Sequence, residues 1–184
     1  VVTTMAGRAG NSGSDDGPLG TARFNYPIGI AADNAGNVYV GDSFRIRKVS
    51  PTGFVTTLAG VVGFQGGQDG VGSEARFGQY LRSVAVDSVG NIYVTDTDKH
   101  TIRKVTPDGE VTTLAGLYET PGSADGFGSA ARFNHPGGIG VDANGNVFVA
   151  DTDNLIIRKI TPDGRVTTIA GIPGVHGLSD GRGT

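Results

Sequence analysis

The sequence predicts an all-β fold built from three successive copies of a four-stranded unit. Glycine occupies 32 of the 184 positions, well above its usual share of about 7%, and each interior glycine costs a helix roughly 1 kcal/mol relative to alanine. The apolar residues are rich in Val and Ile and poor in Leu, a composition that suits strands better than helices. Blocks of residues also recur along the chain, which indicates a repeat architecture.

The repeated unit is marked most clearly by a Val-Thr-Thr block. This block starts at Val2, Val55, Val111 and Val166, at intervals of 53, 56 and 55 residues. An Ala-Arg-Phe block and an Ile-Arg-Lys block return between these starts, always in the same order. Several blocks in one fixed order identify a structural unit that repeats along the chain.

The first two strands of each unit are predicted to form a hairpin. In the first copy the apolar runs 29–32 and 38–40 flank the turn 33–37, which reads Asp-Asn-Ala-Gly-Asn. Gly and Asn tolerate the positive φ angles that tight hairpin turns require. The later copies carry similar turns at 87–91 and 142–146.

The third and fourth strands are predicted to form a second hairpin. The Ile-Arg-Lys block supplies the third strand and the Val-Thr-Thr block the fourth. The turns between them, at 50–53, 106–109 and 161–164, place Gly two positions after Pro, which is a turn signal. A long glycine-rich loop, 116–136 in the clearest copy, then leads to the next unit and is longer than a plain connection.

Stacking of these units predicts a β-propeller. A four-stranded sheet cannot bury both of its faces alone, so neighbouring copies must cover them. Radial stacking of four-stranded sheets gives a propeller. A parallel β-helix fits less well, because its coils use shorter repeats without consecutive hairpins. We predict one repeat domain over 1–184, with blades at 28–60, 83–116 and 138–171.

The third copy resembles the NHL repeat. It reads NHPGGIGVD at 134–142, GNVFVADTDN at 145–154 and IRKI at 157–160. The Asn-His-Leu stretch that names the family is altered here, to Lys-His at 99–100 and Asn-Leu at 154–155, and the first copy is two residues shorter at this turn. The long loops resemble a bacterial subset of these repeats. The resemblance implies propeller blades, commonly six to a ring.

The two ends of the chain are expected to lie inside further units. Residues 1–7 carry a Val-Thr-Thr block alone and are predicted to form an orphan outer strand, and 172–184 are interpreted as a truncated loop. We interpret the chain as a fragment, natural or engineered. Three blades leave two apolar faces open, so we predict a homodimer that closes a six-bladed ring. In that ring 1–7 and 165–171 would compete for one edge.

Composition narrows the possible partners. The net charge of −3 and a pI near 5.5 argue against a general nucleic-acid surface, which needs a positive field. No apolar run approaches the roughly 20 residues that span a bilayer, so no membrane partner is predicted. The absence of cysteine excludes disulfides and Cys-type zinc sites. A soluble protein is expected, bacterial cytoplasmic or exported, with the compartment left open.

Topology places the candidate functional residues at one end of the blades. In an antiparallel meander the second-to-third turns and the long inter-blade loops lie at the same end. Loops on a rigid scaffold carry function, so we expect any ligand at this rim. The rim candidates are Asp42, Asp96, Asp98, His100, Asp151 and Asp153.

Two interpretations of the turn aspartates are open. Carboxylate oxygens suit a hard cation such as calcium, and the residues would be Asp96, Asp98, Asp151 and Asp153. Alternatively, the first Asp of each turn accepts hydrogen bonds from backbone N–H groups or pairs with an arginine. The candidate arginines are Arg47, Arg103 and Arg158. Repetition in every blade favours this structural role, so we predict neither a metal ligand nor a cofactor, with calcium as the alternative.

Two other repeated residues are interpreted as structural. The Asp-Gly pairs of the long loops resemble pieces of calcium-binding repeats but lack their nine-residue period, so loop turns are predicted; these are Asp16, Asp69, Asp125 and Asp180. The arginines of the Ala-Arg-Phe blocks are expected to bond loop carbonyls rather than phosphates. They are Arg23, Arg76 and Arg132.

The histidines are the candidate residues for a catalytic site. His100 has no equivalent in the other blades, whereas His135 stands where the other copies have Tyr26 and Tyr80 and is expected to stack. A site of several histidines is expected to need two copies of the chain. No nucleophile motif such as Gly-x-Ser-x-Gly is present, so no catalytic residue is predicted.

Near-uniform repeats favour a scaffold over an enzyme. We predict an NHL-type propeller module that binds a protein, peptide or glycan ligand, without catalytic activity. The alternative is a hydrolase or lyase with a metal in the central channel. That alternative would require acids or histidines that are unique to one or two blades.

Overall fold

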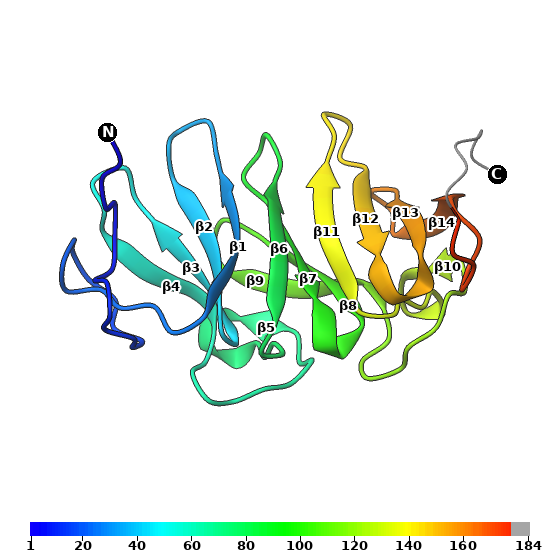
Figure 1. The fold of residues 1–184 in the computed structure, drawn as a ribbon, viewed down its shortest axis with the longest axis horizontal. Coiled ribbons are helices and arrows are strands. Elements are labelled where there is room, and N and C mark those ends of the chain that lie inside the picture. The colour runs from blue at the N-terminus through cyan, green and yellow to red at the C-terminus, as the bar shows by residue number, and fades with distance from the viewer. Residues whose placement is uncertain (178–184) are drawn as a thin grey trace.

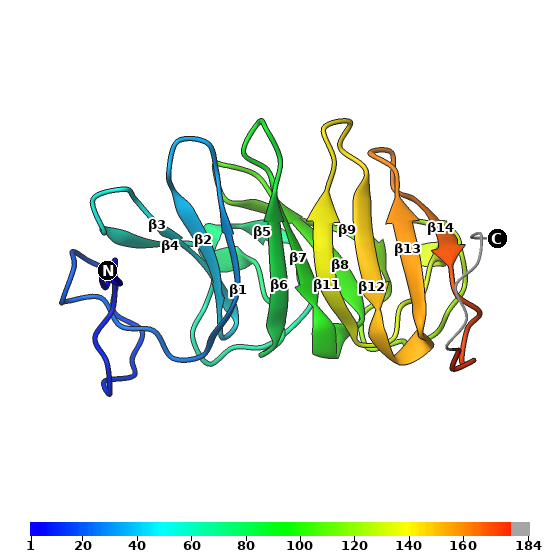
Figure 2. The same ribbon diagram turned by 45° about the horizontal axis from the view of Figure 1, so that its top comes forward.

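A computed structural model describes residues 1–177 and contains three antiparallel sheets that stand side by side in chain order (Figures 1 and 2). The first sheet, blade 1, consists of β1 (Pro27–Ala32), β2 (Val38–Asp42), β3 (Arg45–Val49) and β4 (Val55–Gly60). Its strands pair in chain order, each antiparallel to the last. The predicted four-stranded meander is therefore confirmed.

Blades 2 and 3 repeat this order and each add a two-residue fifth strand. Blade 2 consists of β5 (Gly70–Val71), β6 (Leu81–Val86), β7 (Ile92–Asp96), β8 (Thr101–Val105) and β9 (Glu110–Gly116). Blade 3 consists of β10 (Gly126–Phe127), β11 (Pro136–Val141), β12 (Val147–Asp151), β13 (Ile156–Ile160) and β14 (Arg165–Ala170). Four one-turn 3-10 helices complete the elements: η1 (Gly72–Glu74), η2 (Thr97–Lys99), η3 (Gly128–Ala130) and η4 (Thr152–Asn154). The innermost strands β1, β6 and β11 lie next to one another (Figure 1).

The fifth strands show where the long loops run. β5 pairs with β9, and β10 pairs with β14. A single bridge between Gly17 and Val55 makes the same contact in blade 1. Each long loop therefore crosses to the outer strand of the blade that follows it, and only then turns inward to the first strand.

The core lies between the blades rather than inside a sheet. At the junction of blades 1 and 2, Tyr39, Ile46 and Ala59 pack in one cluster with Phe77 and Val94. The junction of blades 2 and 3 uses the equivalent positions: Tyr93, Ile102 and Ala115 cluster with Phe133 and Val149. Burying both sheet faces in this way is the reason for stacking that the sequence indicated.

Residues 1–7 do not form the expected strand. No strand precedes β1 in the described chain. Its backbone nevertheless lies where an outer strand would lie. A Cβ on Gly53 would come within 2.5 Å of the carbonyl oxygen of Met5, and a Cβ on Gly109 within 2.7 Å of the carbonyl oxygen of Leu58, the equivalent contact one blade later.

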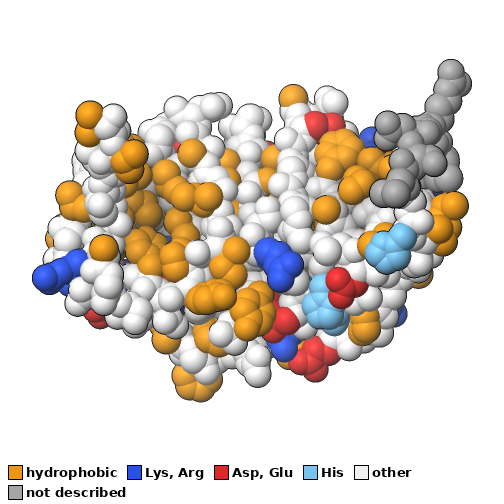
Figure 3. Space-filling view, viewed as in Figure 1, with side chains coloured by type: hydrophobic (Ala, Val, Ile, Leu, Met, Phe, Trp, Pro, Cys, Tyr) orange, Lys and Arg blue, Asp and Glu red, His pale blue; other side chains and the backbone are white. Residues whose placement is uncertain are grey.

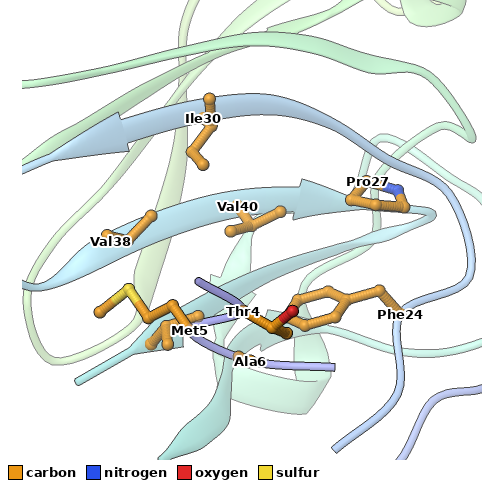
Figure 4. Close-up of a pocket in the computed structure, with 9 residues that line it drawn as sticks. Thr4, Met5, Ala6, Phe24, Pro27, Ile30, Val38 and Val40 are labelled. Atoms are coloured by element: carbon orange, nitrogen blue, oxygen red, sulfur yellow. The ribbon is translucent and has the colours of Figure 1, made fainter. Parts of the chain in front are cut away.

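Within residues 1–177, two blade faces lack a covering blade. On blade 1, Ile30 is 67% exposed, whereas its equivalent Val84 at the first junction is 5% exposed. We call this the leading face; it contains an apolar hollow of about 300 Å³ (Figure 4). The hollow is lined by Thr4, Met5, Ala6, Phe24, Pro27, Ile30, Val38, Val40 and Val49. On blade 3 the trailing face carries Phe148, Ile157 and Ala170, and Ile157 is 39% exposed although its equivalents Ile46 and Ile102 are fully buried.

Candidate functional site

The first Asp of each rim turn is a buried structural residue. Asp42, Asp96 and Asp151 end β2, β7 and β12 and have no exposed surface. Their Oδ1 atoms accept backbone hydrogen bonds from the incoming loop, at 2.8, 2.9 and 2.8 Å; the donors are Asn25, Gly78 and Asn134. The loops and these turns share one end of the blades, as expected. Complete burial removes these three residues from the ligand-rim candidates.

A buried arginine holds each of these carboxylates. The Nη1–Oδ2 distances are 2.9 Å for Arg47 and Asp42, 3.4 Å for Arg103 and Asp96, and 2.8 Å for Arg158 and Asp151. The guanidinium groups also lie 4.8 to 5.0 Å from the ring centroids of the Ala-Arg-Phe phenylalanines, which are Phe24, Phe77 and Phe133. Capping and arginine pairing, the structural interpretation of these turns, are confirmed.

The Asp-Gly pairs of the long loops clamp each loop to the blade that follows. Asp125 accepts from Arg158 at 2.8 Å, from the backbone N–H of Thr168 at 3.1 Å and from its hydroxyl at 3.0 Å. The same three bonds join Asp69 to Arg103 and Thr113, and the first blade repeats them with Asp16. Asp180 lies outside the described residues.

The Ala-Arg-Phe arginines bond loop carbonyls, as expected. The guanidinium of Arg23 donates to the carbonyl oxygens of residues 20, 21 and 22 at 2.7 to 2.8 Å. Arg76 and Arg132 each donate to two of the equivalent carbonyls in their own loops. These side chains therefore fix the path of the loop toward the inner strand.

Burial sets the charge behaviour of the turn carboxylates. Burial raises the pKa of Asp96 to about 7, against the opposing effect of the Arg103 guanidinium. Burial also raises the pKa of Asp151. Asp42 differs in its surroundings, because Arg45 donates to its Oδ2 at 3.0 Å in addition to Arg47.

One group of rim residues lies where blade 2 meets blade 3. We call it the rim cluster: Asp98, Lys99, His100, Glu119, His135 and Asp153. It joins the η2 turn of blade 2, the long loop after β9, and the loop and η4 turn of blade 3. Figure 3, viewed as in Figure 1, shows histidine and acidic side chains close together in the lower part of the molecule. The rim candidates Asp98, His100 and Asp153 lie in this cluster, because both aspartates act on the charge of His100 and Asp153 also contacts His135.

Two histidines meet in this cluster within a single chain. The backbone N–H of His135 donates to Nδ1 of His100 at 3.1 Å, and the two rings pack edge to face with centroids 4.6 Å apart. The expectation that several histidines need two copies of the chain is wrong. The turn of one blade meets the loop that enters the next blade, and His100 and His135 occupy those two positions.

Hydrogen bonding fixes the protons of both rings. Because Nδ1 of His100 accepts a bond from the backbone, the neutral ring carries its proton on Nε2. Nδ1 of His135 lies 2.7 Å from Oδ2 of Asp153, and an ionised carboxylate only accepts, so this Nδ1 carries a proton. Burial and the neighbouring His135 lower the pKa of His100.

A buried lysine links the cluster to the long loop. Nζ of Lys99 donates to Oε1 of Glu119 at 2.9 Å, and Oδ2 of Asp98 lies 3.7 Å away. Burial opposes the charge of Lys99, but the bond to Glu119 and the charge of Asp98 outweigh it and raise the lysine pKa. The lysine also lies 5.4 Å from the ring centroid of Tyr118.

The described part of the chain offers neither a metal site nor a membrane-spanning helix. Within residues 1–177 no group of three or more His, Asp or Glu side chains is arranged to hold a metal ion. No helix in this part of the chain is long and apolar enough to cross a membrane.

Three stacked four-stranded meanders around a common set of inner strands define the protein as a β-propeller. A solved structure of an auxiliary nutrient binding protein from Bacteroides ovatus has the same fold, with a TM-score of 0.62 and 22% identity over 82% of this chain and 37% of that one.

The sequence comparisons identify the repeat. Residues 133–159 match the model of the NHL repeat. The chain is 41% identical to the SUPPRESSOR OF QUENCHING 1 protein of Arabidopsis thaliana over 76% of its length, and 38% identical to NHL repeat-containing protein 2 of Bos taurus over 51%. It belongs to the NHL-repeat β-propellers. It spans 14% and 13% of the lengths of these two relatives.

Proposed function

We propose that this chain is a propeller binding module that closes a six-bladed ring with a second copy of itself. The observation that carries the proposal is the equivalence of its two open faces to the two sides of its own buried junctions. Phe148, Ile157 and Ala170 on the trailing face occupy the repeat positions of Tyr93, Ile102 and Ala115. Those residues are buried against the next blade.

The leading face supplies the complementary side. Phe24 and Val40 occupy the repeat positions of Phe133 and Val149. At the junction of blades 2 and 3, those two residues pack in one buried cluster with Tyr93. The apolar hollow on this face (Figure 4) opens beside Ile30 and Val38. The trailing face of one copy therefore suits the leading face of another. A ring of two copies has two such contacts, which a two-fold axis relates, and both open faces of each copy are then covered.

Ring closure requires one outer strand to move. The segment 1–7 already lies near the position of an outer strand beside blade 1, as the close approach of Met5 to Gly53 indicates. The β14 strand of a second copy would need the same place. In the closed ring one of the two segments pairs with β13, and the other is displaced.

The rim cluster is the proposed ligand site of the closed ring. It brings His100 and His135 together with the ion pair of Lys99 and Glu119, and none of these four residue types recurs at the equivalent positions of the junction between blades 1 and 2. The likeness in fold to a protein described as nutrient binding supports a binding role. The ligand classes that we propose are a protein, a peptide or a glycan.

Light scattering of the purified chain tests ring closure. The expected mass is twice the 18.8 kDa of a single chain. A mass equal to one chain at micromolar concentration would refute the proposal. The binding role would then have to be tested on the half ring.

A further inference from the structure

Side chains of blade 2 hold the inner strand of blade 3. The hydroxyl of Thr95 donates to the carbonyl oxygen of Gly137 at 2.9 Å, and the hydroxyl of Thr97 donates to that of Pro136 at 2.8 Å. The backbone N–H of Ile139 donates to Oγ of Ser83 at 3.2 Å. In blade 1 the position of Thr95 is Gly41, which has no side chain to make such a bond.

At the rim, His100 makes one more contact between blade 2 and the start of β11. It is 8% exposed, and its Nδ1 accepts the backbone N–H of His135, one residue before β11. The bond exists only while Nδ1 is unprotonated, because a protonated imidazole donates from both nitrogens. A protonated His100 would oppose its N–H to that of His135 and lose the contact.

The titratable groups around His100 come from its own turn, from the loop between β9 and β11, and from blade 3. The turn contributes Asp98, which Lys99 approaches at 3.7 Å. The loop contributes Glu119 and His135, and blade 3 contributes Asp151 and Asp153. The three aspartates favour protonation of His100, but burial and His135 outweigh them and lower its pKa.

The junction of blades 1 and 2 lacks both histidines. The left-handed position of His100, with φ of 58°, is occupied by Phe44 in blade 1, with φ of 55°. Tyr80 stands at the position of His135. Neither position therefore carries an imidazole at this junction.

We propose that His100 is a proton-sensitive latch between blades 2 and 3, which holds β11 at neutral pH and releases the rim end of this junction when it is protonated. The contact lies within one chain, so the proposal does not depend on ring closure. The sign follows from the lowered pKa. Between the folded pKa and the unperturbed value near 6.5, the unfolded chain binds the proton more readily. The contribution of His100 is therefore complete above pH 6.5 or so and is lost as the pH falls through the folded pKa.

Urea unfolding of the wild type and of His100→Leu tests the latch. Leucine is matched to the site, because Leu155 occupies the equivalent position in blade 3 with φ of 62°. The midpoint of the wild type should fall relative to that of the variant between about pH 7.5 and pH 5. His176→Ala, which removes an exposed histidine, should follow the wild type. Parallel pH profiles of the wild type and His100→Leu would overturn the proposal.

Amide hydrogen exchange of the wild type gives a second readout that does not require the variant to fold. The protection factor of the His135 amide should fall by about tenfold over this pH range, because one hydrogen bond is lost. The amide of Asp153 bonds the carbonyl of Asn134 at 3.1 Å in the same region and should keep its protection. An unchanged protection factor for His135 would also overturn the latch.

Discussion

Arg158 and Asp151 form an ion pair in which neither side chain has exposed surface, with 2.8 Å between Nη1 and Oδ2. The guanidinium also bonds the carbonyl oxygen of Arg132 at 2.7 Å and Asp125 at 2.8 Å. The Arg158 side chain therefore connects the rim turn, through Asp151, with two points of the long loop that precedes blade 3, Asp125 and Arg132. The same arrangement occurs around Arg47 in blade 1 and Arg103 in blade 2.

Replacing Arg158 by leucine should destabilise the chain by about 3–5 kcal/mol, because it leaves Asp151 buried without its cation. Arg158→Lys should lose most of the same free energy, since an ammonium cannot reach the carbonyl and both carboxylates in one plane. Urea unfolding measures both variants. A loss below about 1 kcal/mol for Arg158→Leu would show that the pair contributes little.

Replacing Asp125 by alanine should release the clamp between the loop and β14. Asp125 is about half exposed, so its three bonds should contribute about 1–3 kcal/mol in total, less than the buried pair. Hydrogen exchange should increase first at the amide of Thr168, which donates to Asp125. Asp108→Ala, in an exposed turn, is the control and should change neither stability nor exchange. Equal effects of the two substitutions would contradict the clamp.

Replacing Ile157 by aspartate should prevent ring closure and give single chains by light scattering. The residue is 39% exposed in one chain, so the single chain should fold with near-normal stability, but a charge in the seam would be buried without a partner. Val89→Asp, at a turn position 73% exposed, is the matched control and should leave the dimer intact. If the Ile157→Asp variant is still a dimer, the dimer contact does not involve the trailing face.

Asp96 should make stability depend on pH in the opposite sense to His100. Burial raises its folded pKa to about 7 from 3.8, so between these values the folded chain binds more protons than the unfolded chain. Its contribution to stability is present below 3.8 and is lost as the pH rises through 7. Relative to Asp96→Asn, the wild type should therefore become less stable from pH 4 to pH 7. If pairing with Arg103 outweighs burial, this slope will have the opposite sign.

The sequence predicted the strands and turns because these depend on local chemistry. Each hairpin turn has its own Asp, Gly or Pro signals, and the blade pattern recurs three times. The fifth strands β5 and β10 were not predicted, since two residues carry no periodic pattern. Their pairing depends on the path of a loop across the next blade.

The end of the blades that carries the turn aspartates was predicted, but the structural role of these residues was predicted only as one of two alternatives. Topology placed the turn aspartates at the loop end of the blades, where they lie. Their burial depends on Arg47, Arg103 and Arg158 turning inward, and the sequence offered this only as one of two interpretations. The contact of His100 with His135 depends on how one blade is rotated against the next. That rotation is not encoded in any single repeat.

The bonds of Asp125 to Arg158 and Thr168 also define which segment of this protein can be transplanted as a unit. Asp125 fastens the loop after β9 to blade 3, and the phenylalanine at the end of that loop packs under Arg158. The cooperative module is therefore a loop together with the strands that follow it, such as 117–171, rather than the four strands alone. Transplanting a blade into another propeller should succeed when the cut falls directly after an outer strand, and should fail when it falls directly before an inner one.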